Sequence, residues 1–79
     1  MSPTVFRKGE YRFFFFSREE KRLHVHVQSS KGEAKFWIDP IVSLAENYGL
    51  SARELLKIQE IVKEHESEIR SSWKKHFRR

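Results

Sequence analysis

The chain has 79 residues and a formal net charge of +5, from 16 lysine and arginine against 11 aspartate and glutamate residues. This length suits one domain over residues 1–79 and excludes separate cofactor and substrate domains. The absence of cysteine excludes disulfides and thiolate metal sites. The sequence also contains no apolar run of signal-peptide or membrane-spanning length. We expect a cytoplasmic domain that uses no small-molecule cofactor and contacts no membrane.

The first half of the chain has the two-residue alternation that is typical of β-strands. We expect strands over residues 4–7, 11–17, 23–28 and 33–38, with Gly9 in the first turn. Because the connections between them are short, neighbouring strands should run antiparallel. The pattern therefore predicts a small antiparallel sheet of three to four strands.

After Asp39 the apolar period changes from two to nearly four residues. Asp39 suits a helix N-cap, and Pro40 suits the first helical position. The apolar residues that follow have helical spacing, namely Ile41, Leu44, Ala45 and Tyr48. We therefore expect a first helix over residues 40–48.

The segment from Leu50 onward carries the clearest local signal in the sequence. Ser51 and Glu54 form a capping box, and Leu50 and Leu55 are placed as its hydrophobic staple. We expect a second helix over residues 52–77, about 40 Å long if unbroken. Its apolar stripe consists of Leu55, Ile58, Val62, Ile69 and Trp73. The predicted fold class is α+β, in which a small antiparallel sheet is followed by two helices packed on one of its faces.

The run Phe13–Phe16 must divide its rings between two faces, because successive side chains of a strand point in opposite directions. Arg12 has the same parity as Phe14 and Phe16. The better core set is therefore Tyr11, Phe13 and Phe15. The next strands complete this core with Leu23, Val25, Val27, Ala34, Phe36 and Ile38. The opposite face then carries Arg12, Phe14, Phe16, His24, His26, Lys35 and Trp37.

Three explanations compete for this basic and aromatic face. Its rings can cover one another or lie under the N-terminal strand, as aromatic ladders do in small sheets. They can instead bind a cognate protein or a second copy of the chain, because burying each Phe contributes about 1.5–3 kcal/mol. The face can also bind nucleic acid, with rings stacking on bases and cations contacting phosphates. The rings would be Phe16 or Trp37, and the cations Arg12, Lys35 and His24.

The C-terminal segment RSSWKKHFRR contains basic residues and no acid. Such cations either complement the dipole at a helix C-terminus or contact phosphates. We include Arg70, Lys74 and Lys75 in the candidate binding surface.

His24 and His26 lie on one side of a strand, with α-carbons about 7 Å apart. As metal ligands they need at least one more group. The nearby acids are Glu20, Glu33 and Asp39, of which Asp39 is expected to cap a helix. The histidines can also act as general base and general acid in metal-independent RNA cleavage, with Lys35 stabilising the phosphorane charge. We name His24, His26 and Lys35 as candidate catalytic residues and expect no metal site.

The segments PTVFRKGEYRFFFFS, HVHV, GEAKFWIDP and LSARELLKIQEIV, with Trp73 after them, occur in a distinctive order and spacing. In this order the chain resembles the uncharacterised prokaryotic domain-of-unknown-function family 4160, from Pro3 to Phe77. The resemblance implies a bacterial component of a toxin–antitoxin-like gene pair and carries over no established catalytic residue. The matching positions of interest are Arg7, Arg12, His24, His26, Lys35, Trp37 and Asp39.

Together these features favour a small cytoplasmic interaction module that binds a cognate protein, or itself, through the basic and aromatic sheet face. The alternative is a metal-independent RNase or RNA-binding protein that uses His24 and His26. The two hypotheses differ in salt dependence, because binding to a polyanion weakens steeply as salt rises.

Overall fold

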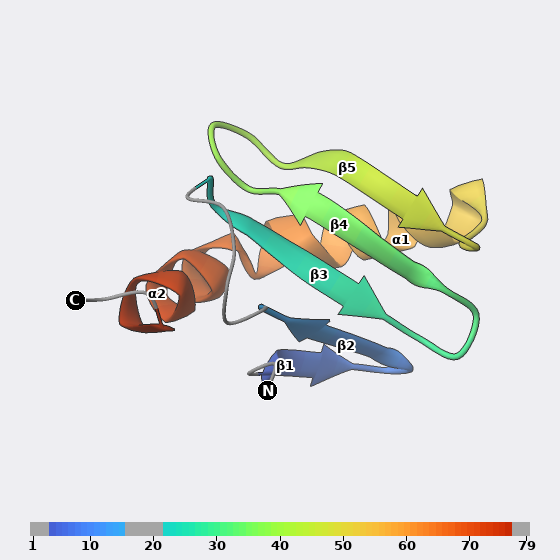
Figure 1. Cartoon of the computed structure of the whole chain (residues 1–79), viewed down its shortest axis with the longest axis horizontal. Helices are drawn as coiled ribbons and strands as arrows, with labels where there is room; N and C mark the ends of the chain where they lie inside the picture. Colours follow the sequence, from blue (N-terminus) through green and yellow to red (C-terminus); the bar gives the residue numbers. More distant parts are fainter. Residues whose placement is uncertain (1–3, 16–21, 77–79) are drawn as a thin grey trace.

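The computed structural model describes residues 4–15 and 22–76. Within these ranges the chain forms an antiparallel sheet of five strands in the order β1-β2-β3-β4-β5, followed by two helices (Figure 1). The strands are Thr4–Lys8 (β1), Tyr11–Phe14 (β2), His24–Gln28 (β3), Glu33–Trp37 (β4) and Ser43–Tyr48 (β5). The helices are Ala52–Glu64 (α1) and Glu66–His76 (α2). The α+β class is confirmed, but the sheet is larger than the three to four strands predicted.

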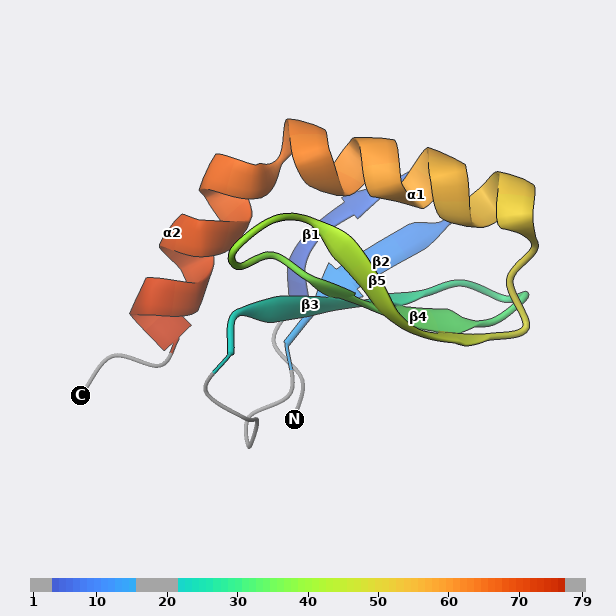
Figure 2. The same ribbon diagram turned by 90° about the horizontal axis from the view of Figure 1, so that it is seen from above.

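The apolar core joins residues of the sheet to residues of α1. Figure 2 shows α1 lying along one face of the sheet. In the strand register Phe13 lies opposite Val27, and Val25 lies opposite Phe36. The predicted core residues Tyr11, Phe13 and Phe15 are all buried in this cluster. The cluster also contains Ile58 and Val62 of α1 and Ile69 of α2. The predicted division of the phenylalanine run is therefore confirmed for Phe13 and Phe15, whereas Phe16 lies outside the described residues.

The predicted helix over residues 40–48 is wrong, because Ser43–Tyr48 is the edge strand β5. A short helix depends on burying its apolar face. Here that stripe buries little, with Ile41 exposed by 70%, Leu44 by 44% and Tyr48 by 65%. As a strand the same residues pair with β4 and satisfy its backbone groups. Asp39 caps no helix, and its carbonyl accepts a hydrogen bond from Arg22 Nε at 3.0 Å.

The predicted continuous helix over residues 52–77 is interrupted at His65. Figure 2 shows α1 lying along the sheet and α2 turning past its end. At the bend the His65 ring packs 4.3 Å from the Phe6 ring, centroid to centroid. A straight helix would run past the sheet, whereas the bend brings Ile69 and Trp73 to the core. In the part of the chain that the structure describes, no helix is long and apolar enough to span a membrane.

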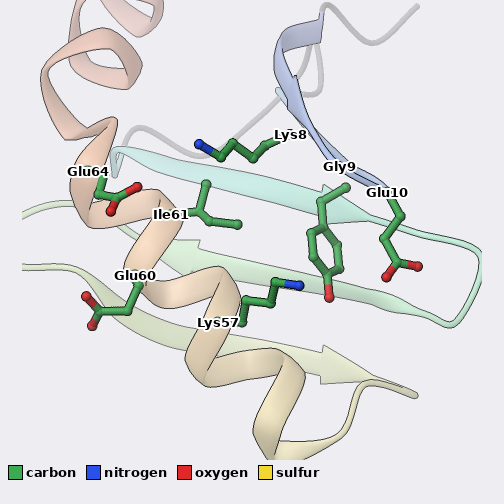
Figure 3. Close-up of a pocket in the computed structure, with 8 residues that line it drawn as sticks. Lys8, Gly9, Glu10, Lys57, Glu60, Ile61 and Glu64 are labelled. Atoms are coloured by element: carbon green, nitrogen blue, oxygen red, sulfur yellow. The ribbon is translucent and has the colours of Figure 1, made fainter.

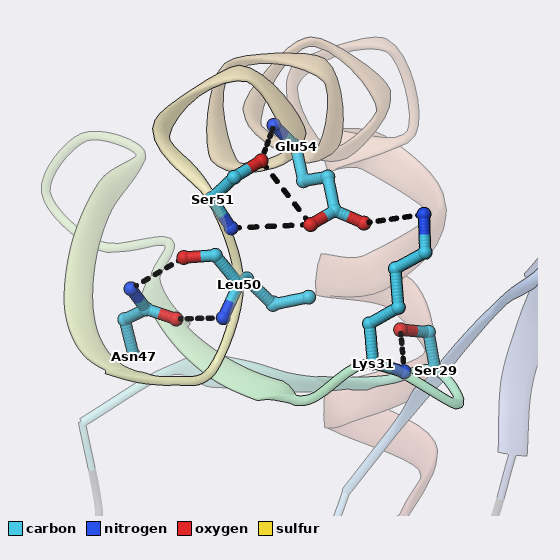
Figure 4. A network of polar contacts seen from close by, with 6 residues as sticks. All are labelled: Ser29, Lys31, Asn47, Leu50, Ser51 and Glu54. Carbon is cyan, nitrogen blue, oxygen red and sulfur yellow. Dashed lines mark hydrogen bonds and ion pairs between the residues drawn. The ribbon is translucent and has the colours of Figure 1, made fainter.

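The capping box at the start of α1 is confirmed and joins a wider polar network (Figure 4). The Glu54 backbone N–H donates to Ser51 Oγ at 3.2 Å, and the Ser51 backbone N–H donates to Glu54 Oε1 at 3.1 Å. Lys31 Nζ, in the β3–β4 turn, lies 3.6 Å from Glu54 Oε2. Leu50 is buried in the core and Leu55 packs against it, as expected of the staple positions.

Acidification should reduce stability through Glu54. The hydrogen bond from the Ser51 backbone N–H holds the pKa of Glu54 below its ordinary value; partial burial opposes this effect, and the Ser51 hydroxyl and Lys31 reinforce it. Near and below pH 4.5 the folded state therefore binds fewer protons at this site than the unfolded state, so stability falls as pH falls. Urea midpoints measured from neutral pH into this range should show a smaller decrease in Glu54→Gln, whose amide does not titrate there. An identical pH dependence in both proteins would contradict the expectation.

Candidate functional site

The face of the sheet opposite α1, called the back face below, carries the predicted binding residues of the sheet. Register places one row across all the described strands: Thr4, Phe14, His26, Lys35 and Glu46. A second row consists of Arg7, Arg12, Gln28, Glu33 and Tyr48, and a third of His24, Trp37 and Ser43. None of these residues belongs to the apolar core cluster. The predicted parity therefore brings the described sheet residues of the candidate surface together.

Cationic side chains cover the aromatic rings of the back face. The Arg12 guanidinium carbon lies 4.5 Å from the Phe14 ring centroid. Trp37 has the Arg22 guanidinium carbon at 4.1 Å and Lys35 Nζ at 4.5 Å. Phe14 is only 4% exposed, whereas Arg22 is exposed and Arg12 half-buried. Since stacking places the positive groups over the rings, the surface presents charge more than bare aromatic area.

His24 occupies a closed position at the end of the back face that α2 approaches. It is fully buried, and its Nδ1 lies 2.6 Å from the Arg22 carbonyl oxygen, a geometry that suits Nδ1–H donation. Its ring centroid is 5.1 Å from that of His26, 5.7 Å from Trp37 and 5.2 Å from Trp73. The burial favours a packing role for His24, while the half-buried His26 stacks on Phe14 at 5.5 Å.

The acids considered as metal ligands do not gather around the two histidines. Glu33 begins β4 opposite Gln28, whereas Asp39 lies beyond the other end of β4, past Trp37. Glu20 lies outside the described residues. Over residues 4–15 and 22–76 no group of three or more His, Cys, Asp or Glu side chains is placed to hold a metal ion.

The basic residues predicted in the C-terminal segment occupy two different environments. Arg70 donates from Nε to Glu66 Oε2 at 2.9 Å and from Nη2 to the Ile38 carbonyl at 3.2 Å, and its Nη1 lies 3.7 Å from Asp39 Oδ1. These contacts tie α2 to the end of β4, a structural role. Lys74 and Lys75 are exposed in the last turn of α2, where cations complement the helix dipole.

Two further arginines lie at this site, and neither was predicted as part of the binding surface. Arg7 lies opposite Arg12 in the β1–β2 register, and Arg22 stacks on Trp37 from the residues before β3. The short turn at Gly9 could have indicated that Arg7 lies beside Arg12, because a tight hairpin places residues equidistant from its turn side by side. With Arg12 and Lys35 these residues bring four cations to the back face, whereas the acids of its rows are Glu33 on β4 and Glu46 on β5.

A separate pocket of about 650 Å³ opens on the helix side, between the β1–β2 hairpin and α1 (Figure 3). Buried Tyr11 and Ile61 contribute to its wall, and burial raises the pKa of the Tyr11 hydroxyl above its ordinary value. Its charged lining contains both signs, with two lysines and three glutamates: Lys8, Lys57, Glu10, Glu60 and Glu64. This mixture favours neither anionic nor cationic ligands, so the pocket does not define a site.

Comparison with known proteins gives one family. The family model described as "Domain of unknown function (DUF4160)" matches residues 10–74. No curated protein and no solved structure matches the chain. The match covers β2 to α2 and thus includes most of the back face and the bend at His65.

Proposed function

Because the chain belongs to the DUF4160 family of domains of unknown function, we propose from its back face that it is a small interaction module that binds an acidic surface of a cognate protein. The proposal places the chain in a toxin–antitoxin-like gene pair in the bacterial cytoplasm, with the product of the adjacent gene as its partner. The resemblance to family 4160 supports this context. The positive charge of the back face supports binding to an acidic surface.

The single observation that carries the proposal is the stacking of cations on rings. Arg12 is held over Phe14 and also donates from Nε to Thr4 Oγ1 at 2.7 Å. Arg22 is held over Trp37 while it donates to the Asp39 carbonyl. Side chains already fixed in one orientation lose less conformational entropy on binding. A positive, preorganised surface also accelerates encounter with an acidic partner.

The charge pattern favours an acidic partner over face-to-face pairing of two copies. Two back faces brought together would each contribute an excess of positive charge, from Arg7, Arg12 and Arg22, and like charges disfavour association. Nucleic acid is also less favoured, because recognition of single strands uses rings that are open to base stacking. Phe14 is almost fully buried, and cations already cover Trp37. RNA cleavage through His24 and His26 would require a fully buried imidazole to reach a phosphate.

Two neighbouring residues of β1 provide a matched test. Arg7 and Lys8 are both exposed, but Arg7 pairs with Arg12 on the back face and Lys8 with Tyr11 on the helix side. We expect Arg7→Glu to weaken binding to the adjacent gene's protein product about tenfold, as for loss of a charge contact of about 1.4 kcal/mol. Lys8→Glu, with the same change in net charge, should alter the dissociation constant less than about twofold. Isothermal titration calorimetry at physiological salt measures both.

Failure of the proposal would take recognisable forms. Absence of a complex with the adjacent gene's product, or an equal loss in both variants, would contradict recognition through the back face. Tighter binding of a labelled single-stranded oligoadenylate than of that protein would favour the RNA hypothesis. If the wild-type chain cleaves this RNA and the His26→Ala variant does not, the result would support the RNase hypothesis.

A further inference from the structure

The outer edge of β5 is a second exposed surface, distinct from the back face. β5 is the last strand in the sheet order, so one of its sides faces no other strand among the described residues. The described residues include four exposed large apolar side chains, and three lie on β5 or just before it: Ile41, Leu44 and Tyr48. An edge strand with apolar side chains and unpaired backbone groups is a template for another strand.

The two edges of the sheet differ in their protection. β1 ends in the exposed cations Arg7 and Lys8, and its Phe6 ring is stacked 4.4 Å from Phe13 on the inner side. Charged residues on an edge strand oppose edge-to-edge pairing. β5 contains a single charged residue, Glu46, and no lysine or arginine. The β5 edge is therefore the better site for strand addition.

The side chains of β5 are arranged so that an antiparallel second copy of the strand would place residues of the same face opposite one another. Because the β4–β5 register shifts between Lys35 and Phe36, Ser43 and Glu46 both lie on the back face, opposite Trp37 and Lys35. Asn47 lies opposite the core residue Ala34 on the helix side, and Val42 packs against the core on that same side. An antiparallel partner centred between residues 44 and 45 would therefore pair back-face residues with back-face residues.

We propose that two copies of the chain pair antiparallel through β5, about a two-fold axis between Leu44 and Ala45. In this register each Glu46 meets Ser43 of the second copy, whose hydroxyl can donate to the carboxylate. The two Glu46 carboxylates are thus kept apart. Exposed Ile41 meets exposed Tyr48 of the second copy, which removes apolar surface from water at both ends.

A second copy fits this edge better than an open series of chains. Pairing of β5 with β1 of another copy would be heterologous and would continue into a larger ring or a filament, whereas β5–β5 pairing closes after two chains. The contact leaves the back faces uncovered and places them side by side on one continuous sheet. The inference therefore does not rest on the proposed function, and either can fail alone.

Sedimentation equilibrium over a wide concentration range tests the pairing. The wild-type chain should reach twice the 9.6 kDa mass of one chain. Ser43→Glu places a carboxylate opposite Glu46 of the second copy and should raise the dimer dissociation constant about tenfold or more. The double variant Ser43→Glu/Glu46→Lys makes these positions complementary and should restore the dimer. Leu56→Ser, which removes an exposed apolar side chain from α1, should leave the mass unchanged.

Circular dichroism shows whether each variant is folded. If Ser43→Glu does not fold, Leu44→Lys at a partly exposed position provides the same test by adding a charge to the edge. A wild-type chain that remains at the mass of one chain at every concentration would overturn the proposal, and β5 would be left for a strand of a different protein. A dimer that persists in folded Ser43→Glu, or that folded Ser43→Glu/Glu46→Lys fails to restore, would also overturn it.

Discussion

Replacing Gly32 by alanine is expected to lower the free energy of unfolding by about 3 kcal/mol, the upper range for overpacking of a closely packed position. A Cβ atom at Gly32 would overlap the carbonyl oxygen of Tyr48 and lie 3.0 Å from the carbonyl carbon of Gly49. These are backbone atoms, so rotation of a side chain cannot relieve the clash. Either the β3–β4 turn or the connection from β5 to α1 must move.

The matched control for this prediction is Gly9→Ala in the β1–β2 turn. Gly9 has φ +60°, but a Cβ there would meet no heavy atom within 4 Å. Its replacement should lower the free energy of unfolding by only about 1 kcal/mol, the cost of holding a residue with a Cβ atom in the left-handed conformation. Thermal unfolding followed by circular dichroism should show a melting temperature at least about 8 °C lower for Gly32→Ala than for Gly9→Ala. Equal losses would contradict the close approach at Gly32, because the positive-φ glycines are Gly9 and Gly49 and alanine meets no such conformational cost at position 32.

The second large effect is expected from truncation of Ile69. This side chain is fully buried and joins α2 to the core beyond the bend at His65. Ile69→Ala should lower the free energy of unfolding by about 3 kcal/mol, because it removes buried methyl groups and leaves a cavity. The same change at Ile41, which is 70% exposed in the single chain, should cost less than about 0.5 kcal/mol when unfolding is measured at protein concentrations too low for pairing. Urea denaturation of the two variants measures the difference.

This pair also tests the structure of residues 40–48. If that segment formed the helix that its apolar spacing suggests, Ile41 would face the core and its truncation would approach the cost at Ile69. A large loss in Ile41→Ala would therefore contradict the assignment of β5. A small loss in Ile69→Ala would contradict the packing of α2 against the core.

The sequence predicted which of the described strand residues share the back face, but not how far each side chain is exposed to solvent. Alternation along Tyr11–Phe14 and His24–Gln28 was enough to place Phe14 and His26 on the back face, because parity is a local property of a strand. That Arg22 covers Trp37, and that Trp73 packs against His24, could not be read from alternation. These contacts join residues that only the strand register and the bend between α1 and α2 bring together.

The amino-acid sequence by itself determined what short-range physics controls: the alternation that divides Phe13 from Phe14, and the capping box of Ser51 and Glu54. The tertiary structure alone decided the state of residues 43–48 and the interruption at His65. Spacing at residues 41–48 permits a helix, but the free edge of β4 supplies backbone partners that a short exposed helix cannot match. The predicted single helix likewise bends at His65, where the sheet ends. Only because α2 turns there does Ile69 reach the core.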